Sequence, residues 1–172
     1  DLEKQIAYQV GAMQALAVMA GHKVTHVKTH GAMGNMSNDD DDMAMAVGRA
    51  IKAVDPSLVY VVMPGLSTER AAEKLGLPMA REVFADRTYD DAGNLTSRKV
   101  EGAVIHDAAM AAQRVLRMVE DQEVVTVTGK KLKVKIDTIC VHGDNPAAVA
   151  MAKTVRDTLE AAGIAIRPFR AG

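Results

Sequence analysis

Apolar residues recur along this chain in two patterns. Residues 2–20 place an apolar side chain at every third or fourth position and end at Gly21, which predicts an amphipathic helix closed by glycine. The short runs 58–63 and 138–141 are almost continuously apolar, as parallel strands covered on both faces are. The two patterns alternate along the chain and therefore predict an α/β fold with a parallel sheet and right-handed crossovers.

Breaks in these patterns predict the remaining elements. A β-hairpin is predicted where residues 124–128 and 132–136 flank Gly129 and Lys130. Residues 89–95 predict a tight turn, and residues 31–35 a loop that contains glycine. Further helices are predicted over 39–54, 67–75, 101–120 and 146–162, and further strands over 26–30, 81–85 and 164–168. Ser67 or Thr68 is expected to cap the helix 67–75, and Gly76 to end it.

Composition narrows the class of protein. The 172 residues are expected to form one domain, and a net charge of -1 gives no reason to propose nucleic acid or an anionic membrane as a partner. No stretch approaches the roughly 20 apolar residues of a membrane span. The single cysteine, Cys140, lies in a predicted strand, so a disulfide framework is excluded and a cytoplasmic location is expected.

Polar side chains gather where predicted strands end. His142 and Asp144 follow the strand 138–141, and His30 follows the strand that also carries Lys28. Asp86 and Arg87 end the strand 81–85 in the same way. Since α/β folds place their sites at the carboxyl ends of strands, we expect these residues to line one shared pocket. Asn35 and Arg98 follow in the adjoining segments, whereas His22 and His106 are interpreted as surface or helix residues.

Four blocks of sequence carry a family resemblance. They are VKTHGAMGN (27–35), REVFADRTYDDAGNLTSR (81–98), GAVIHD (102–107) and TICVHGDNPAA (138–148). Their order and spacing resemble the LamB/YcsF family. The resemblance implies a (β/α) barrel of the seven-stranded, deacetylase-like type, incomplete here, with parallel strands and one β-hairpin. It also implies ATP-dependent opening of the lactam 5-oxoproline to glutamate by the A subunit of a 5-oxoprolinase, acting with subunits B and C.

The family resemblance also bears on length. Family members carry a further N-terminal segment with the first barrel strands, so we expect this chain to be a trimmed subunit with an incomplete site. We count only about five parallel strands, whereas a closed barrel needs roughly seven or eight. The strands 26–30 and 164–168 would then flank an opening with unpaired backbone groups, which predicts a homo-oligomer that covers them.

Lactam hydrolysis suggests a role for each candidate residue. His142 and Asp144 are the expected base and its orienter, or a pair of ligands, although Asp144 can equally cap the following helix. Asp86 is assigned to proton transfer and Arg87 to the substrate carboxylate, with a structural ion pair as the alternative. The remaining candidates are His30 as a further catalytic imidazole or a histidine at the core rim, Lys28 and Arg98 as anion clamps, and Asn35 as a donor to a carbonyl oxygen or a loop cap.

Two other functions remain open from the sequence. One is a metal-dependent deacetylase or amide hydrolase, in which His30, His142, Asp86 and Asp144 would supply ligands. We expect no bound metal, because the chain has no HxxxH-type pair on one helix. The other is a protein that binds the substrate without catalysis. Because the chain also lacks a GxxxxGK[ST] loop, we expect ATP to be handled mainly with the partner subunits.

Overall fold

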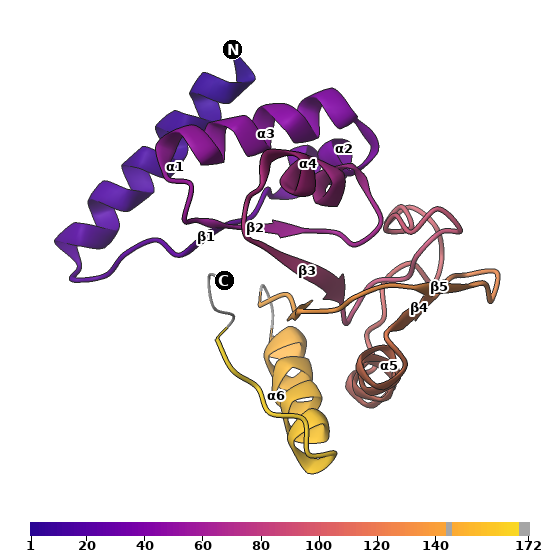
Figure 1. Cartoon of the computed structure of the whole chain (residues 1–172). Coiled ribbons are helices and arrows are strands. Elements are labelled where there is room, and N and C mark those ends of the chain that lie inside the picture. Colours follow the sequence, from indigo (N-terminus) through magenta and orange to yellow (C-terminus); the bar gives the residue numbers. More distant parts are fainter. Residues whose placement is uncertain (144–145, 169–172) are drawn as a thin grey trace. The chain divides into compact units, whose positions relative to one another are not determined.

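The computed structural model describes residues 1–143 and 146–168 (Figure 1). These residues form two compact units, residues 1–81 and residues 82–168. Strand β3 (Met79–Phe84) contains the boundary, so its first half belongs to the N-terminal unit and its second half to the C-terminal unit. The expectation of one domain stays a prediction.

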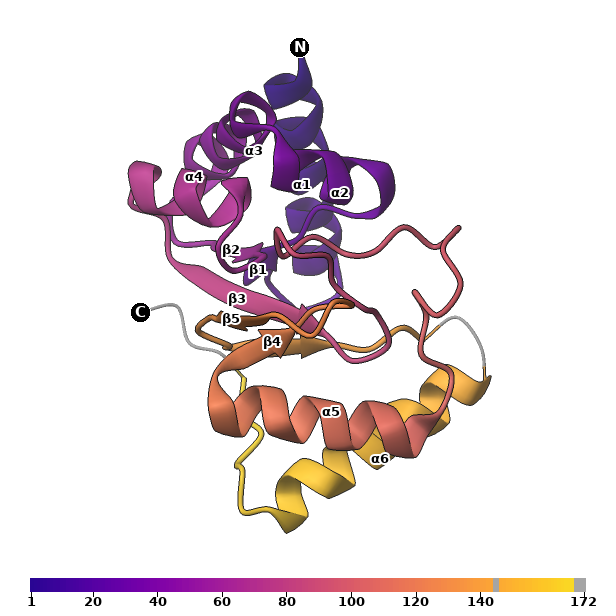
Figure 2. The same ribbon diagram turned by 90° about the vertical axis from the view of Figure 1, so that its right-hand side faces the viewer.

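The N-terminal unit is a layer of helices on parallel strands. Strand β2 (Val59–Val62) pairs in parallel with β1 (His26–Val27) on one side and with residues 79–81 of β3 on the other. Helix α3 packs against both α1 and α4 (Figures 1 and 2). The bounds of the helices are α1 (Leu2–Met19), α2 (Gly31–Asp39), α3 (Asp41–Val54) and α4 (Ser67–Leu75).

The core of the N-terminal unit explains why these segments fold as they do. Side chains at 47, 50 and 51 of α3 are fully buried, as the helical period requires, and all four residues of β2 are buried. Val47, Ile51 and Tyr60 lie in one cluster with Ile6 and Val10 of α1. Burial of each large apolar side chain of this kind stabilises the fold by about 1.5–3 kcal/mol.

Helix ends in this unit confirm one predicted cap and correct another. Gly76 ends α4 in the left-handed conformation with φ of +65°, as predicted. Ser67 and Thr68 do not cap α4: Leu66 is the N-cap, and both hydroxyls lie inside the first turn and bond to other groups. The sequence pattern placed the cap one or two residues late.

Residues 31–35 were predicted as a loop, and this was wrong. They form the first half of α2, which continues to Asp39. The glycine at position 34 marks a close approach: a Cβ there would lie 3.1 Å from the carbonyl oxygen of Thr29. Glycine at position 34 therefore lets the backbone of Thr29 pack closely against α2. Gly31 and Gly34 both belong to the helix and do not mark a loop.

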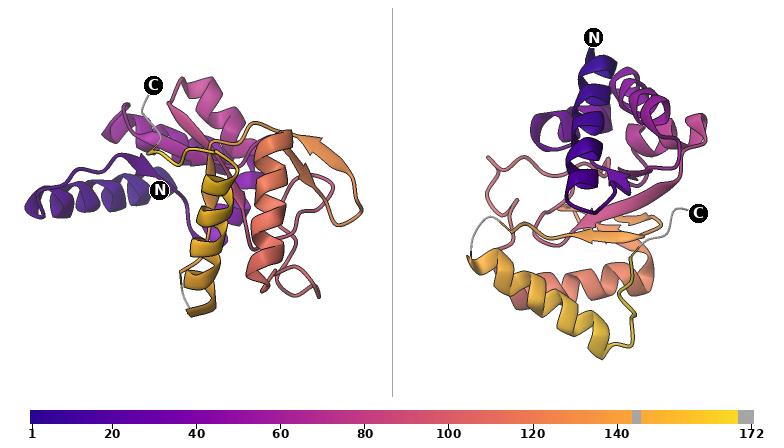
Figure 3. Two further views of the ribbon diagram at one scale, coloured as in Figure 1. Left: turned by 90° about the horizontal axis from the view of Figure 1, so that it is seen from below. Right: turned by 90° about the vertical axis from the view of Figure 1, so that its left-hand side faces the viewer.

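The C-terminal unit packs two helices against its strands. Residues 82–84 of β3 pair in parallel with β6 (Thr138–Cys140), and β4 (Glu123–Val125) and β5 (Lys131–Lys133) form the predicted antiparallel hairpin. Helices α5 (Ala108–Asp121) and α6 (Pro146–Ala161) lie side by side (Figures 2 and 3). Their shared core contains Ala111, Val115, Met151, Val155 and Leu159.

Two elements predicted in the C-terminal unit were wrong in part. The helix predicted over 101–120 begins only at Ala108, because the Asp107 carboxylate caps it by accepting from the Met110 amide at 2.8 Å. The segment before it pairs instead as an isolated bridge between Arg87 and Val104. Residues 164–168 form no strand; Ile164 closes the turn after α6 through a bond to the Leu159 carbonyl at 3.0 Å. The predicted opening between strands therefore has no strand at 164–168.

The tight turn predicted over 89–95 is confirmed. Tyr89 and Leu95 bridge across it, and the Asp90 carboxylate accepts from the Asn94 amide at 2.9 Å.

No helix formed by residues 1–143 and 146–168 is long and apolar enough to cross a membrane.

Candidate active site

Strand register brings Asp86 and His142 together. Phe84 at the end of β3 pairs with Cys140 at the end of β6, and each candidate residue lies two positions further along its chain segment. The Ala85 amide donates to the Cys140 carbonyl at 3.0 Å and extends this pairing. As a result, the Nδ1 atom of His142 lies 2.5 Å from the Oδ2 atom of Asp86. The sequence predicted both residues at strand ends, and the parallel pairing of β3 with β6 makes them neighbours.

The hydrogen bond to Asp86 determines which ring nitrogen of His142 carries the proton. An ionised carboxylate only accepts, so in the neutral ring Nδ1 carries the proton and Nε2 offers its lone pair. The Nη2 atom of Arg98 lies 3.5 Å from Nε2. The ring of Phe84 lies 6.2 Å away, centre to centre, at a tilt of 33°. The His142 side chain is 24% exposed, so it can meet a ligand from solvent.

A small pocket of about 130 Å³ opens at this pair. Asp86, Arg98 and His142 line it, together with His106 and Met151. His106 was interpreted from the sequence as a surface or helix residue; it lies before α5 and borders the pocket. The bond from the Ile105 amide to the Asp86 carbonyl, 2.8 Å long, ties its segment to the site. Its place in the GAVIHD block was the signal that could have identified it.

The side chain of Arg87 does not reach the pocket that its neighbour Asp86 lines. Its side chain is buried, and Nη2 donates to the carbonyl of Thr96 at 2.6 Å. Burial lowers its pKa, the nearby charge of Arg98 lowers it further, and Asp86 opposes the shift. Arg87 does not line the 130 Å³ pocket; it holds the segment that carries Arg98. The structure therefore places Arg98, not Arg87, beside the imidazole.

Two of the three candidates in the N-terminal unit lie at a second pocket, of about 340 Å³. Lys28 and His30 line it with His26, and His30 is the N-cap residue of α2, although its side chain makes no capping bond. Asn35 is exposed on α2 and does not line this pocket. Because these residues and the Asp86–His142 pair belong to different units, the shared pocket stays a prediction. Asp144 lies outside the described residues.

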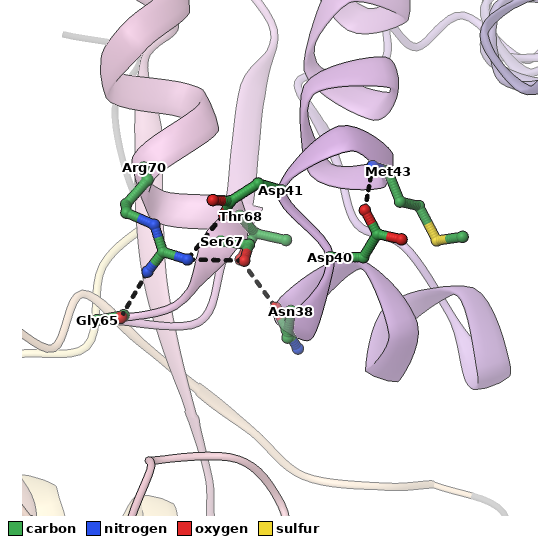
Figure 4. A network of polar contacts seen from close by, with 8 residues as sticks. All are labelled: Asn38, Asp40, Asp41, Met43, Gly65, Ser67, Thr68 and Arg70. Carbon is green, nitrogen blue, oxygen red and sulfur yellow. Dashed lines mark hydrogen bonds and ion pairs between the residues drawn. The ribbon is translucent and has the colours of Figure 1, made fainter.

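A polar network that sequence reasoning missed follows the end of β2 (Figure 4). Arg70 donates to the Asp41 carboxylate at 2.7 Å, to the Ser67 hydroxyl at 2.8 Å and to the Gly65 carbonyl at 3.3 Å. Hydrogen bonds from Ser67 and Arg70 lower the pKa of Asp41. The polar groups satisfy one another, so the network fixes the β2–α4 connection; it lines neither pocket that holds candidate residues.

The described residues include no cluster of side chains suited to bind a metal ion. Among residues 1–143 and 146–168, no three His, Cys, Asp or Glu side chains are grouped so as to hold a metal ion. The expected absence of a bound metal therefore stays a prediction.

The chain is an α/β protein in which a histidine–carboxylate pair lies at the ends of two neighbouring parallel strands. The chain belongs to the LamB/YcsF family, whose sequence profile matches residues 1–172. This confirms the resemblance drawn from the four sequence blocks.

Similar proteins agree with this family. The chain is 55% identical over 99% of its length to a 5-oxoprolinase A subunit of Nitrobacter hamburgensis, and 57% identical over 98% to one of Rhodopseudomonas palustris strain BisB5. It covers 67% and 66% of those proteins, so it spans about two thirds of their length. The crystal structure of a lactam utilization protein from Thermus thermophilus matches with a TM-score of 0.89 and 39% identity, over 98% of this chain and 67% of that one.

Proposed function

We propose that this chain is the part of a 5-oxoprolinase A subunit that carries an acid–base pair for hydrolysis of 5-oxoproline to glutamate. The 2.5 Å hydrogen bond between His142 and Asp86 carries the proposal, because it leaves Nε2 as a base at the mouth of a pocket. The name shared by relatives more than 50% identical to the chain supports the substrate.

The proposed chemistry starts from a water held near Nε2 of His142. As the water oxygen bonds to the lactam carbon, Nε2 takes its proton, and Asp86 stabilises the imidazolium through Nδ1. The ring C–N bond then breaks, and the imidazolium returns the proton to the leaving nitrogen. Without ATP this sequence adds one water across one amide bond and gives the open amino acid.

ATP is proposed to enter by activating the lactam. Transfer of its terminal phosphoryl group to the amide oxygen makes the ring carbon a better electrophile. Ring opening by one water then leaves an acyl phosphate, and a second water hydrolyses it to glutamate and phosphate. We assign the phosphoryl transfer mainly to partner subunits B and C, since the sequence has no GxxxxGK[ST] loop to hold the phosphates of a nucleotide.

Arg98 is the proposed clamp for the substrate carboxylate. A guanidinium binds a carboxylate through two parallel hydrogen bonds, and Arg98 borders the pocket beside His142. His106 lies on the same pocket and is proposed to contact the ring. Lys28 and His30 are kept as proposed anion-binding and proton-transfer groups, and Asn35 and Asp144 keep their predicted roles as proposals. Arg87 is proposed to hold the segment that carries Arg98.

The assembly is proposed in three parts. The parallel β/α units are proposed to belong to an incomplete (β/α) barrel of the seven-stranded type, in agreement with the fold match to the lactam utilization protein. The chain is proposed to form homo-oligomers, since Tyr8, Leu16 and Met19 of α1 leave 77%, 58% and 84% of their surface exposed. A cytoplasmic location is proposed because Cys140 is the single cysteine of the sequence and no disulfide framework can form.

The deciding experiment measures glutamate and ADP released from 5-oxoproline and ATP. The chain is mixed with subunits B and C, beside His142→Ala, Asp86→Asn and the matched control His22→Ala. His22 is exposed and lines neither pocket that holds candidate residues. We expect the first two variants to lose glutamate formation by about 10²–10⁴-fold and the control to keep it.

Other outcomes of this assay select the alternatives. Turnover that survives His142→Ala would favour a protein that only binds substrate. Turnover of an acetylated amide that chelators abolish, with no glutamate formed, would favour the metal-dependent hydrolase. Light scattering at increasing chain concentration tests the oligomer, and a mass equal to one chain throughout would contradict it.

A further inference from the structure

A half-buried arginine, Arg114, contacts the backbone next to Asp86. Arg114 of α5 directs its Nη1 atom to the carbonyl oxygens of Phe84, at 3.1 Å, and Ala85, at 3.4 Å. These are the two residues immediately before Asp86. Arg114 does not line the 130 Å³ pocket, so it contacts the backbone that carries Asp86 and not that pocket; it borders a separate pocket of about 690 Å³.

Tyr89 completes this support from the other direction. Its hydroxyl oxygen accepts from the Phe84 amide at 2.6 Å, and the Arg114 guanidinium lies 5.3 Å from the centre of its ring. Both backbone groups of Phe84 are therefore held by side chains, one by Tyr89 and the other by Arg114. The end of β3 consequently has little freedom to rotate, and the position of the Asp86 carboxylate follows from it.

The charges around Asp86 show what this support does for the site. The Oδ1 atom of Asp86 and the Nη2 atom of Arg114 are both buried, and neither has a hydrogen-bond partner within residues 1–143 and 146–168. Burial lowers the pKa of Arg114, while attraction to Tyr89 and Asp86 opposes the shift. A buried carboxylate oxygen without a partner is costly, and a cation nearby offsets part of that cost.

We propose that Arg114 is a positioning residue, which fixes the end of β3 so that Oδ2 of Asp86 accepts the Nδ1 proton of His142. The proposal deepens the proposed function and rests on it for the role in catalysis. Its structural part concerns only which ring nitrogen of His142 carries the proton. That state can be measured without any substrate, so the positioning role and the lactam reaction are tested separately.

The first test reads the His142 tautomer by ¹⁵N NMR of the chain, with His142→Gln used to assign its signals. In the unmodified chain we expect the proton on Nδ1, as Asp86 requires. In Arg114→Met we expect a mixture with the Nε2-protonated form, and in Arg114→Lys a return toward the unmodified spectrum. Arg117→Met is the matched control, because Arg117 lies one turn along α5 and is exposed.

The second test is kinetic and uses the assay with subunits B and C. Arg114→Met should lower kcat by about 10–100-fold, the range typical of residues that orient a catalytic ligand, with KM changed less than about twofold. Arg114→Lys should recover part of kcat, and Arg117→Met should leave both constants unchanged. A defect spread equally over kcat and KM would contradict a positioning role.

The outcomes are decisive in each case. An unchanged His142 tautomer in a folded Arg114→Met chain would overturn the proposal, as would an unmodified chain in which Nδ1 carries no proton. If circular dichroism shows that Arg114→Met does not fold, the proposal is tested with Arg114→Lys. If that variant does not fold either, Arg114 is a purely structural residue and the proposal is overturned. A tautomer shift in a chain without lactam turnover would leave positioning intact and overturn only the proposed function.

Discussion

The hydroxyl of Thr68 joins the end of α2 to the end of β2. Its Oγ1 atom donates to the Asn38 side-chain oxygen at 2.8 Å and accepts from the Met63 amide at 3.2 Å. The Asn38 amide in turn donates to the Met63 sulfur at 3.0 Å. All these groups are buried, so each depends on the others for its hydrogen bonds.

Thr68→Val tests how much this hydroxyl contributes to stability. Valine keeps the shape but leaves the Asn38 oxygen and the Met63 amide without their partner. We expect the free energy of unfolding to fall by about 1–3 kcal/mol. Urea denaturation measures it, with the exposed Thr25→Val as a control expected to stay within about 0.5 kcal/mol. A loss equal to that of the control would contradict the shared network.

Two helical glycines are expected to respond differently to substitution by alanine. Gly11→Ala in α1 meets no heavy atom within 4 Å, so it should raise the free energy of unfolding by roughly 0.5–1 kcal/mol. Gly34→Ala in α2 places its Cβ 3.1 Å from a backbone oxygen, so the segment with Lys28 and His30 must shift. We expect no gain in stability there. Thermal melting of both variants is the measurement, and equal gains would show that the turn at Thr29 yields freely.

Arg87→Met should change substrate affinity more than rate. The substitution removes the bond to the Thr96 carbonyl and loosens the segment that positions Arg98. If Arg98 binds the substrate carboxylate, we expect KM to rise roughly tenfold with kcat little changed, as for Arg98→Met itself. Steady-state kinetics of the two single variants and the double variant decide the point. Fully additive effects would mean that Arg87 does not act through Arg98.

Alkaline pH should destabilise the fold through two buried tyrosines. Burial raises the pKa of Tyr60 and of Tyr89 above the ordinary value of about 10. The unfolded chain therefore loses these protons first, and the stabilisation present below about pH 10 is lost as the pH rises further. Urea unfolding from about pH 8 to about pH 11 measures this slope. An unchanged slope in Tyr60→Phe would contradict the contribution of Tyr60.

The same two tyrosines should differ at neutral pH. The Tyr60 hydroxyl has no hydrogen-bond partner in the described part of the chain, so Tyr60→Phe should be neutral or stabilising near neutral pH. Tyr89→Phe leaves the Phe84 amide without its acceptor and should lower the free energy of unfolding by about 1–3 kcal/mol. Urea denaturation of the two variants side by side measures the difference, and equal losses would contradict it.

The sequence predicted the elements better than their ends. Apolar runs identified β2 and β6 to within a residue, because full burial on both faces leaves a continuous pattern. The pattern failed over 101–107: Val104 and Ala108 continue the apolar spacing of α5, although the Asp107 cap starts the helix later. That extension also hid His106, which looked like one more helical residue.

The contact between Asp86 and His142 could not be predicted from the sequence. Both residues were assigned to strand ends, and the orienter expected for His142 was Asp144, which lies outside the described residues. The structure shows that Asp86 bonds to Nδ1. Local spacing cannot reveal this contact, because it depends on which strands pair and in what register. The register of Phe84 with Cys140 supplies that information.

The separation of 56 residues between Asp86 and His142 has a consequence for synthesis on the ribosome. β2 and β3 are close in sequence and can pair as soon as both have left the exit tunnel, whereas β6 emerges much later. During that interval the nascent chain carries the Asp86 carboxylate, and later the Arg114 cation, without their imidazole. The contact between Asp86 and His142 therefore forms only after β6 has been synthesised and has paired with β3.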